Sequence, residues 1–214
     1  MGASPKAIEA FKSVADRLEL YPDGSASRLR DAIGARYGLD PARIVCGAGS
    51  DEILSLITNA YIGPGDEGIF TAHGFLVYKI AIQAAGGVPV VAEEKDFRTD
   101  VDAILAKVSP RTKIVFLANP NNPTGVVYRE ADIAALLDLC AEKDLLLASD
   151  EAYCKLMQPG QVHVPVMKYH KHLNRLILLG TFSKSYAMTG WRLGYLVAPP
   201  DLIDYLYGIH RAIN

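Results

Sequence analysis

Residues 145–153 have the sequence Leu-Leu-Leu-Ala-Ser-Asp-Glu-Ala-Tyr. The first five positions are apolar or small, as in a parallel strand whose two faces are both covered by helices. The run then ends abruptly at Asp150 and Glu151. A carboxylate at the end of a buried strand is costly unless it meets a positive partner. The stretch therefore predicts a central strand of an α/β fold, with a ligand crevice beyond its carboxyl end.

Further apolar runs alternate with amphipathic stretches along the chain. The alternation predicts an α/β protein, with strands at residues 44–46, 67–70, 88–91, 113–117, 145–149, 176–179 and 192–197. Apolar residues at helical spacing form one stripe at Ile133, Leu136, Leu137 and Cys140, and another at Ile8, Phe11, Ala15 and Leu18. We expect each stripe to pack on the sheet.

Composition excludes several classes of function. The chain has 214 residues, half of them hydrophobic, and a formal net charge of -2, so it can bury a sizeable core and has no charge that favours nucleic acid. No uninterrupted apolar run approaches the ~20 residues that span a bilayer. We therefore expect no membrane or nucleic-acid partner.

Cysteine and histidine spacing indicates neither disulfides nor a metal site. The cysteines are odd in number and widely spaced, which is typical of reduced thiols in the cytosol: Cys46, Cys140 and Cys154. The histidines lack ligand spacing, so we interpret them as structural or surface residues: His73, His163, His170, His172 and His210.

Unusual chemistry follows four of the predicted strands. The first segment, residues 47–52, is a glycine-containing turn that opens a helix, where free backbone amides suit a phosphate group. The alternative is an ordinary strand-to-helix turn with Ser50 or Asp51 as N-cap. The second, residues 119–125, is Asn-Pro-Asn-Asn-Pro-Thr-Gly. Its prolines restrict the backbone and would hold the Asn122 amide towards a ligand, unless the segment is a plain Asn-Pro turn.

The third segment is the Asp-Glu-Ala-Tyr stretch after residues 145–149. A protonated pyridine nitrogen would give Asp150 its positive partner, although Asp150 could instead cap a helix. The fourth segment, residues 181–192, gathers hydroxyl groups with Lys184 and Arg192. A lysine in a buried cleft can form an imine with an aldehyde and then move protons, whereas solvated surface lysines are commoner.

In this order, the four segments resemble the fold-type I aminotransferases of class I and II, over essentially the whole chain. The resemblance implies the large cofactor-binding domain of that fold, a three-layer αβα arrangement with a mainly parallel sheet. It also implies an enzyme that uses pyridoxal 5'-phosphate to exchange amino groups between amino acids and oxo acids. Lys184 would attach the cofactor and shuttle the proton, Asp150 would pair with the pyridine nitrogen, and Tyr153 would share the catalytic site.

The same resemblance implies how the cofactor is bound. Asn122 and Tyr153 would contact the phenolic oxygen of the ring, and Phe75 would stack on its face. The phosphate would be held by Ser50, Asp51, Thr181, Ser183 and Arg192. The sequence departs from the family before Phe75, where His73-Gly74 replaces the more frequent Pro-Thr.

Residues 21–24, 28–30 and 49–53 are similar to the histidinol-phosphate aminotransferase branch in particular. That branch implies conversion of histidinol phosphate and 2-oxoglutarate to imidazole acetol phosphate and glutamate, in cytoplasmic histidine biosynthesis. It also implies a homodimer in which Tyr21 reaches the cofactor phosphate of the neighbouring subunit. Residues 188–192 are also typical of aspartate, alanine and aromatic aminotransferases, and a related phosphothreonine decarboxylase shares much of the scaffold. A non-catalytic domain that binds pyridoxal phosphate is a further alternative.

The resemblance also predicts the domain organisation. Residues 1–200 would form the large domain, with residues 1–20 as its start after a missing N-terminal arm. Residues 201–214 would begin the connection to a C-terminal small domain that is absent from the chain. The family places its substrate-carboxylate arginines in that small domain, so we expect this chain to be a fragment.

Overall fold

The computed structural model describes residues 2–169 and 174–213, and its centre is a seven-stranded sheet. The sheet order is β1-β9-β8-β7-β6-β2-β3, and β4 and β5 form a separate antiparallel pair. Within the large sheet β9 is antiparallel to both neighbours, and the other pairs are parallel. The predicted, mainly parallel α/β sheet is confirmed. The strands are β1 (Ile44–Gly47), β2 (Glu67–Thr71), β3 (Val88–Ala92), β4 (Glu94–Lys95), β5 (Arg98–Thr99), β6 (Thr112–Ala118), β7 (Leu146–Asp150), β8 (Leu176–Thr181) and β9 (Gly194–Val197).

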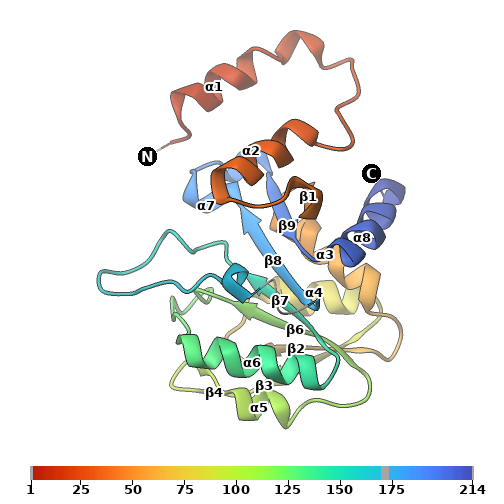
Figure 1. Cartoon of the computed structure of the whole chain (residues 1–214), viewed down its shortest axis with the longest axis vertical. Helices are drawn as coiled ribbons and strands as arrows, with labels where there is room; N and C mark the ends of the chain where they lie inside the picture. Colours follow the sequence, from red (N-terminus) through yellow and green to blue (C-terminus); the bar gives the residue numbers. More distant parts are fainter. Residues whose placement is uncertain (1, 170–173, 214) are drawn as a thin grey trace.

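Helices cover both faces of this sheet and make the expected three layers (Figure 1). Helices α3, α4 and α8 pack on one face, and α2, α5 and α6 on the other. The helices are α1 (Pro5–Lys12), α2 (Ser27–Tyr37), α3 (Ser50–Tyr61), α4 (Leu76–Ala84), α5 (Val101–Leu105), α6 (Glu130–Glu142), α7 (Phe182–Ser185) and α8 (Pro200–Ile213). Short 3-10 turns are η1 (Ala15–Arg17), η2 (Pro41–Arg43), η3 (Val166–Tyr169) and η4 (Thr189–Trp191). In the part of the chain described, no helix has the length and apolar character needed to span a bilayer.

Strand β6 shows why the strands are apolar throughout. Successive side chains of a strand point to opposite faces, so Ile114 and Phe116 join the core under α3 and α4. Val115 and Leu117 join the core under α6. Each of these side chains is at most 2% exposed. Burial on both faces removes the apolar-polar alternation that a half-exposed strand would have.

The register of the sheet brings distant residues to one edge. Ala118 at the end of β6 pairs with Asp150 at the end of β7, and Asp150 pairs with Leu179 two residues before the end of β8. Because parallel strands end on the same side, the segments that follow β6, β7 and β8 emerge together. This edge is where ligands bind in open α/β sheets.

One expected packing arrangement is wrong. The stripe of Ile8, Phe11, Ala15 and Leu18 does not pack on the sheet, because α1 ends at Lys12 and the chain continues through the 3-10 turn η1. Ile8, Phe11 and Leu18 are 42%, 59% and 77% exposed. Figure 1 shows α1 standing apart from the sheet. Its contact with the body of the chain includes the ring of Phe11 against Trp191, with centroids 5.5 Å apart.

Two strand boundaries also differ from expectation in an informative way. The last strand begins at Gly194 rather than at residue 192, since Arg192 has a left-handed backbone (φ 51°) that an extended strand does not accept. At the C-terminal end, residues 200–213 form α8, which buries Leu202, Ile203 and Leu206 in the core beside α3. The further domain expected beyond this helix stays a prediction.

Candidate active site

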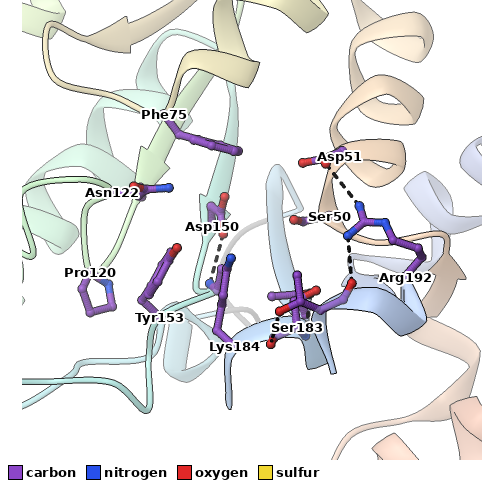
Figure 2. A pocket seen from close by; sticks show the side chains of 14 residues that line it. Ser50, Asp51, Phe75, Pro120, Asn122, Asp150, Tyr153, Ser183, Lys184 and Arg192 are labelled. Carbon is purple, nitrogen blue, oxygen red and sulfur yellow. Dashed lines mark hydrogen bonds and ion pairs between the residues drawn. The ribbon is translucent and has the colours of Figure 1, made fainter. Parts of the chain in front are cut away.

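A pocket opens at the carboxyl edge of the sheet, where the segments after β1, β2, β6, β7 and β8 converge (Figure 2). It has a volume of about 600 Å³, which includes space open to solvent. Its lining is Ser50, Asp51, Phe75, Ala118, Pro120, Asn122, Asp150, Ala152, Tyr153, Thr181, Ser183, Lys184, Thr189 and Arg192. The four segments singled out in the sequence therefore meet in one place.

Asp150 forms the floor of this pocket. The residue is 6% exposed, and burial raises the pKa of its carboxyl above the ordinary value. Oδ2 accepts a hydrogen bond from the Tyr78 hydroxyl at 3.0 Å, and Oδ1 accepts one from the Ala152 amide at 3.0 Å. Residues after Asp150 form a turn rather than a helix, so the helix-cap alternative is wrong. Within residues 2–169 and 174–213, no Lys, Arg or His forms an ion pair with this carboxyl.

Lys184 enters the pocket from the short helix α7, which directly follows β8. Thr181 caps the short helix α7 by accepting from the Ser183 amide, which fixes the turn that carries the lysine. The Lys184 ammonium lies 5.5 Å from the centroid of the Tyr153 ring. Figure 2 shows Lys184 between Tyr153 and Ser183, with its amine directed towards Asp150. The pocket thus holds a buried carboxyl at the end of β7 and an amine on the short helix that follows the adjacent strand β8.

Donors suited to an anion line the opposite end. Helix α3 begins at Ser50 after Gly49 (φ 90°), so Ser50 and Asp51 have the first amides of the helix. The cap is Gly49 and not Ser50 or Asp51, so that alternative is wrong. Nη2 of Arg192 contacts Asp51 Oδ2 at 3.2 Å, and a Cβ at position 49 would lie 2.7 Å from the same nitrogen. Only a glycine gives the guanidinium this approach to the helix start.

The remaining side of the pocket has an aromatic face and an amide. Phe75 precedes α4, and its ring meets that of Tyr78 edge to face, with centroids 5.8 Å apart. Asn122 belongs to the Asn-Pro loop after β6, and Figure 2 shows it on the same side of the pocket as Tyr153. This arrangement presents one flat apolar surface beside two polar groups.

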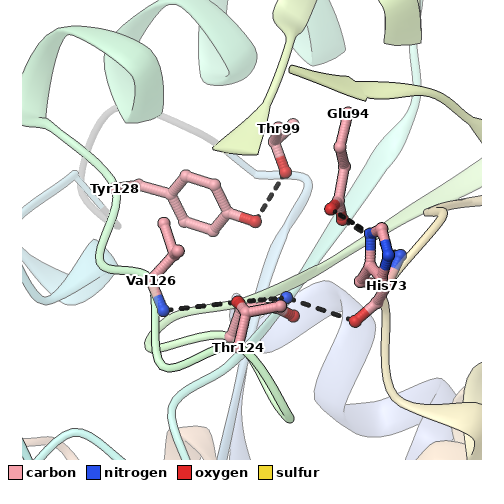
Figure 3. Close-up of polar contacts among 7 residues, drawn as sticks. His73, Glu94, Thr99, Thr124, Val126 and Tyr128 are labelled. Atoms are coloured by element: carbon pink, nitrogen blue, oxygen red, sulfur yellow. Dashed lines mark hydrogen bonds and ion pairs between the residues drawn. The ribbon is translucent and has the colours of Figure 1, made fainter. Parts of the chain in front are cut away.

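The loop with Asn122 and the turn with Phe75 are tied to each other (Figure 3). Asn121 donates to the His73 carbonyl at 3.2 Å and to Thr124 Oγ1 at 2.9 Å. His73 Nδ1 in turn contacts Glu94 Oε2 at 2.8 Å. His73 thus links its turn to the Asn-Pro loop through its carbonyl and to Glu94 through its side chain.

The structure brings together nearly all of the residues expected from the sequence. Tyr21 is the exception: it does not line the pocket, and its side chain is fully exposed. The expected roles of the pocket residues stay predictions. Tyr78 was not among the residues expected from the sequence. It lies in the first turn of α4, three residues after the N-cap Phe75, and its contact with Asp150 is seen only in the structure.

Pyridoxal 5'-phosphate fits this donor set. A protonated ring nitrogen would give the buried Asp150 carboxyl the cation it lacks among the described residues. The start of α3 and Arg192 suit the phosphate, because helix N-termini and guanidinium groups both favour anions. Phe75 suits the ring face, and Lys184 suits the aldehyde.

Comparison with known proteins agrees with this geometry. The sequence model of the family described as aminotransferase class I and II matches residues 2–214. The curated histidinol-phosphate aminotransferases of Rhodospirillum centenum and Paramagnetospirillum magneticum are 45% and 47% identical over 214 residues. All of this chain is covered, but it spans 59% and 58% of those proteins.

Solved structures give the same result for the fold. A double mutant of Thermus thermophilus aspartate aminotransferase matches with a TM-score of 0.90 and 27% identity, over 99% of this chain and 58% of that one. YbdL of Escherichia coli, described as having a methionine aminotransferase function, matches with a TM-score of 0.90 and 28% identity. It covers 100% of this chain, which spans 59% of YbdL.

Proposed function

The chain belongs to the class I and II aminotransferase family, and from that premise we propose that its pocket binds pyridoxal 5'-phosphate and serves transamination. The proposed reaction converts histidinol phosphate and 2-oxoglutarate to imidazole acetol phosphate and glutamate. The observation that carries the proposal is a pocket that contains both the Lys184 amine and a buried Asp150 carboxyl, which has no ion-pair partner among the described residues.

When bound, the cofactor supplies a ring that accepts the electron pair left by a broken Cα–H bond. In this proposal Asp150 holds a proton on the ring nitrogen, which keeps that ring electron-poor. Lys184 Nζ first anchors the cofactor and then moves the proton from the substrate Cα. Tyr153 and Asn122 bind the phenolic oxygen, while Phe75 fixes the plane of the ring. The phosphate is bound by Arg192, Ser183, Thr181 and the first backbone amides of α3.

The substrate assignment rests on the curated relatives. The proteins at 45% and 47% identity are named histidinol-phosphate aminotransferases, whereas the solved aspartate and methionine enzymes are only 27% and 28% identical. This difference favours histidinol phosphate over aspartate or methionine as amino donor. The chain spans less than two thirds of these proteins, so the assignment extends their activity to this chain as a proposal.

We also propose a homodimer in the cytoplasm. Phe11, Leu18, Leu20 and Tyr21 are exposed apolar or aromatic side chains on the segment that stands apart from the sheet. A second copy of the chain would cover them and receive Tyr21 at its cofactor phosphate. Sedimentation of the Tyr21→Ala variant together with wild type tests the contact. A monomeric wild-type protein would contradict the dimer.

Covalent trapping tests the central proposal. The purified chain is mixed with pyridoxal phosphate, reduced with borohydride and mapped by mass spectrometry. We expect the label on Lys184, no label in Lys184→Ala, and unchanged labelling in the control Lys155→Ala, whose ammonium lies 5.5 Å from the centroid of the Tyr37 ring. Label on another lysine of the wild-type protein would refute the assignment.

A half-reaction tests the substrate. The change in cofactor absorbance is followed after addition of histidinol phosphate, aspartate or methionine. We expect histidinol phosphate to react fastest at equal concentration. Equal or faster reaction with aspartate or methionine would refute the substrate assignment and leave the cofactor assignment to the trapping experiment.

A further inference from the structure

A second group of reactive side chains lies behind the cofactor pocket. Glu151 and Cys154 come from the turn after β7, and His163 comes from the irregular segment that precedes η3. One potential ligand atom from each residue lies within 4.8 Å of the other two. Sequence spacing did not predict this group, because eight residues of loop lie between Cys154 and His163.

The group is held in place by buried hydrogen bonds. Glu151 is 7% exposed, and its Oε1 accepts from the Val166 amide at 2.8 Å. Its Oε2 lies 2.9 Å from Nε2 of His163, whose side chain is 11% exposed. These contacts place a carboxylate and an imidazole side by side with little freedom to turn away.

His163 has an unused nitrogen. Its Nδ1 is buried and has no hydrogen-bond partner among the residues that the structure describes. A neutral imidazole has one N–H, so one of its two nitrogens is a bare acceptor. With the proton on Nδ1, the bare acceptor is Nε2, which lies 2.9 Å from a carboxylate oxygen of Glu151. Two acceptors in contact are unfavourable, and a cation bound to both atoms removes this repulsion.

Cys154 adds a soft ligand on the third side. Cys154 is half-buried, and its sulfur is the ligand atom that lies within 4.8 Å of those of Glu151 and His163. A thiol that coordinates a divalent cation loses its proton. Thiolate, imidazole and carboxylate together are the ligand types that zinc takes in proteins.

The group is reached from a pocket of its own. That pocket has a volume of about 1530 Å³, which includes space open to solvent, and all three residues line it together with Tyr37, Tyr186 and Tyr195. Asp150 and Tyr153 line the cofactor pocket, whereas Glu151 and Cys154 line this second one. A solute can therefore reach the group without entering the cofactor pocket.

We propose that Glu151, Cys154 and His163 bind one zinc ion, with water from the second pocket as the fourth ligand. The ion ties the turn that contains Tyr153 to the loop that contains His163. It acts on the cofactor pocket through the position of Tyr153 and takes no part in the chemistry there. This proposal is independent of the proposed transamination, because the cluster and its pocket are present whatever the cofactor pocket binds.

Equilibrium dialysis with zinc chloride tests the site on the purified chain in the presence of a phosphine reductant. We expect one zinc ion per chain, and at least ~10-fold weaker binding in Cys154→Ser, the loss that even partners outside the ligand shell produce. Cys46→Ser is the matched control, since Cys46 is a half-buried free thiol in β1 away from the cluster. It should bind zinc as the wild type does.

Cobalt and hydrogen exchange give two further readouts. Cobalt(II) should produce a thiolate-to-metal charge-transfer band that Cys46→Ser keeps and Cys154→Ser loses. Zinc should slow amide exchange in residues 151–166. If Cys154→Ser does not fold, His163→Gln replaces it, with the same expected loss of zinc. Zinc bound below one equivalent, or bound equally well by Cys154→Ser and His163→Gln, would overturn the proposal.

Discussion

Replacement of Tyr78 by phenylalanine isolates one hydrogen bond at the centre of the pocket. The Tyr78 hydroxyl donates to Asp150 Oδ2 at 3.0 Å, and the tyrosine is 1% exposed. Its ring stacks on Phe116 with centroids 5.1 Å apart. Tyr78→Phe keeps this stack and removes the hydroxyl alone. A hydrogen bond to a charged group contributes about 1.5–3 kcal/mol.

The sign of the effect on stability follows from the carboxyl. The folded-state pKa of Asp150 lies above its ordinary 3.8, because burial disfavours the charge. The stability that this group contributes is therefore fully present below the ordinary pKa of 3.8 and is lost as pH rises through the folded-state pKa. The Tyr78 hydroxyl favours the carboxylate, so Tyr78→Phe raises the pKa of Asp150 further. We expect the variant to lose about 1.5–3 kcal/mol at neutral pH and less near about pH 4.

The same change weakens cofactor binding in the proposed function. The hydrogen bond is already present in the cofactor-free chain, so affinity for pyridoxal phosphate falls only by the extra strength that the bound cofactor gives to this bond. We expect a fall of up to about tenfold, which corresponds to about 1.4 kcal/mol. Urea unfolding of the cofactor-free chain and absorbance titration with the cofactor measure the two effects. Tyr128→Phe is the matched control, because the Tyr128 hydroxyl is buried and bonds Thr99 rather than a carboxyl. Equal behaviour of the two variants in both assays would refute the reasoning.

Three other changes have distinct expected outcomes. Asp150→Asn should weaken cofactor affinity by roughly 3–5 kcal/mol. It should also stabilise the cofactor-free chain at neutral pH, because a neutral amide replaces a buried carboxylate that has no ion-pair partner among the described residues. If cofactor titration and urea unfolding show neither change, the assigned role of Asp150 is wrong. Glu67→Gln should destabilise the chain by about 1–3 kcal/mol in urea at neutral pH. The hydrogen bond from Ser109, with those from Thr112 and Arg111, lowers the pKa of Glu67. The stability that Glu67 contributes is therefore present above the ordinary pKa of 4.5 and is lost as pH falls through the folded-state pKa. A loss of stability that does not depend on pH would argue against this. Arg192→Lys should weaken binding of pyridoxal phosphate roughly tenfold but leave pyridoxal binding unchanged, and equal losses for both ligands would place Arg192 away from the phosphate.

Much of the fold could be predicted from sequence because burial leaves a direct pattern. The strands at residues 113–117 and 145–149 are apolar on both faces, which distinguishes central parallel strands from edge strands. The site followed from the same pattern, because polar residues directly after such strands share one edge of the sheet. Helical spacing was less informative at Ile8 and Phe11. It shows which side chains share a face, but not whether another part of the chain covers that face.

Tyr78 shows what a pattern of residue types does not contain. Helix α4 is rich in apolar residues, so a tyrosine on its buried face looks like ordinary core, and its ring does pack there on Phe116. Its role depends on where the hydroxyl lies, and that position depends on how α4 crosses the end of β7, a long-range contact between residues 72 positions apart. The pocket residues could be found because each follows a strand. Tyr78 lies in a helix, behind the carboxyl that it contacts, so geometry was needed to identify it. The pH-dependent loss expected for Tyr78→Phe therefore tests a part of the site that the structure, and not the motif, defines.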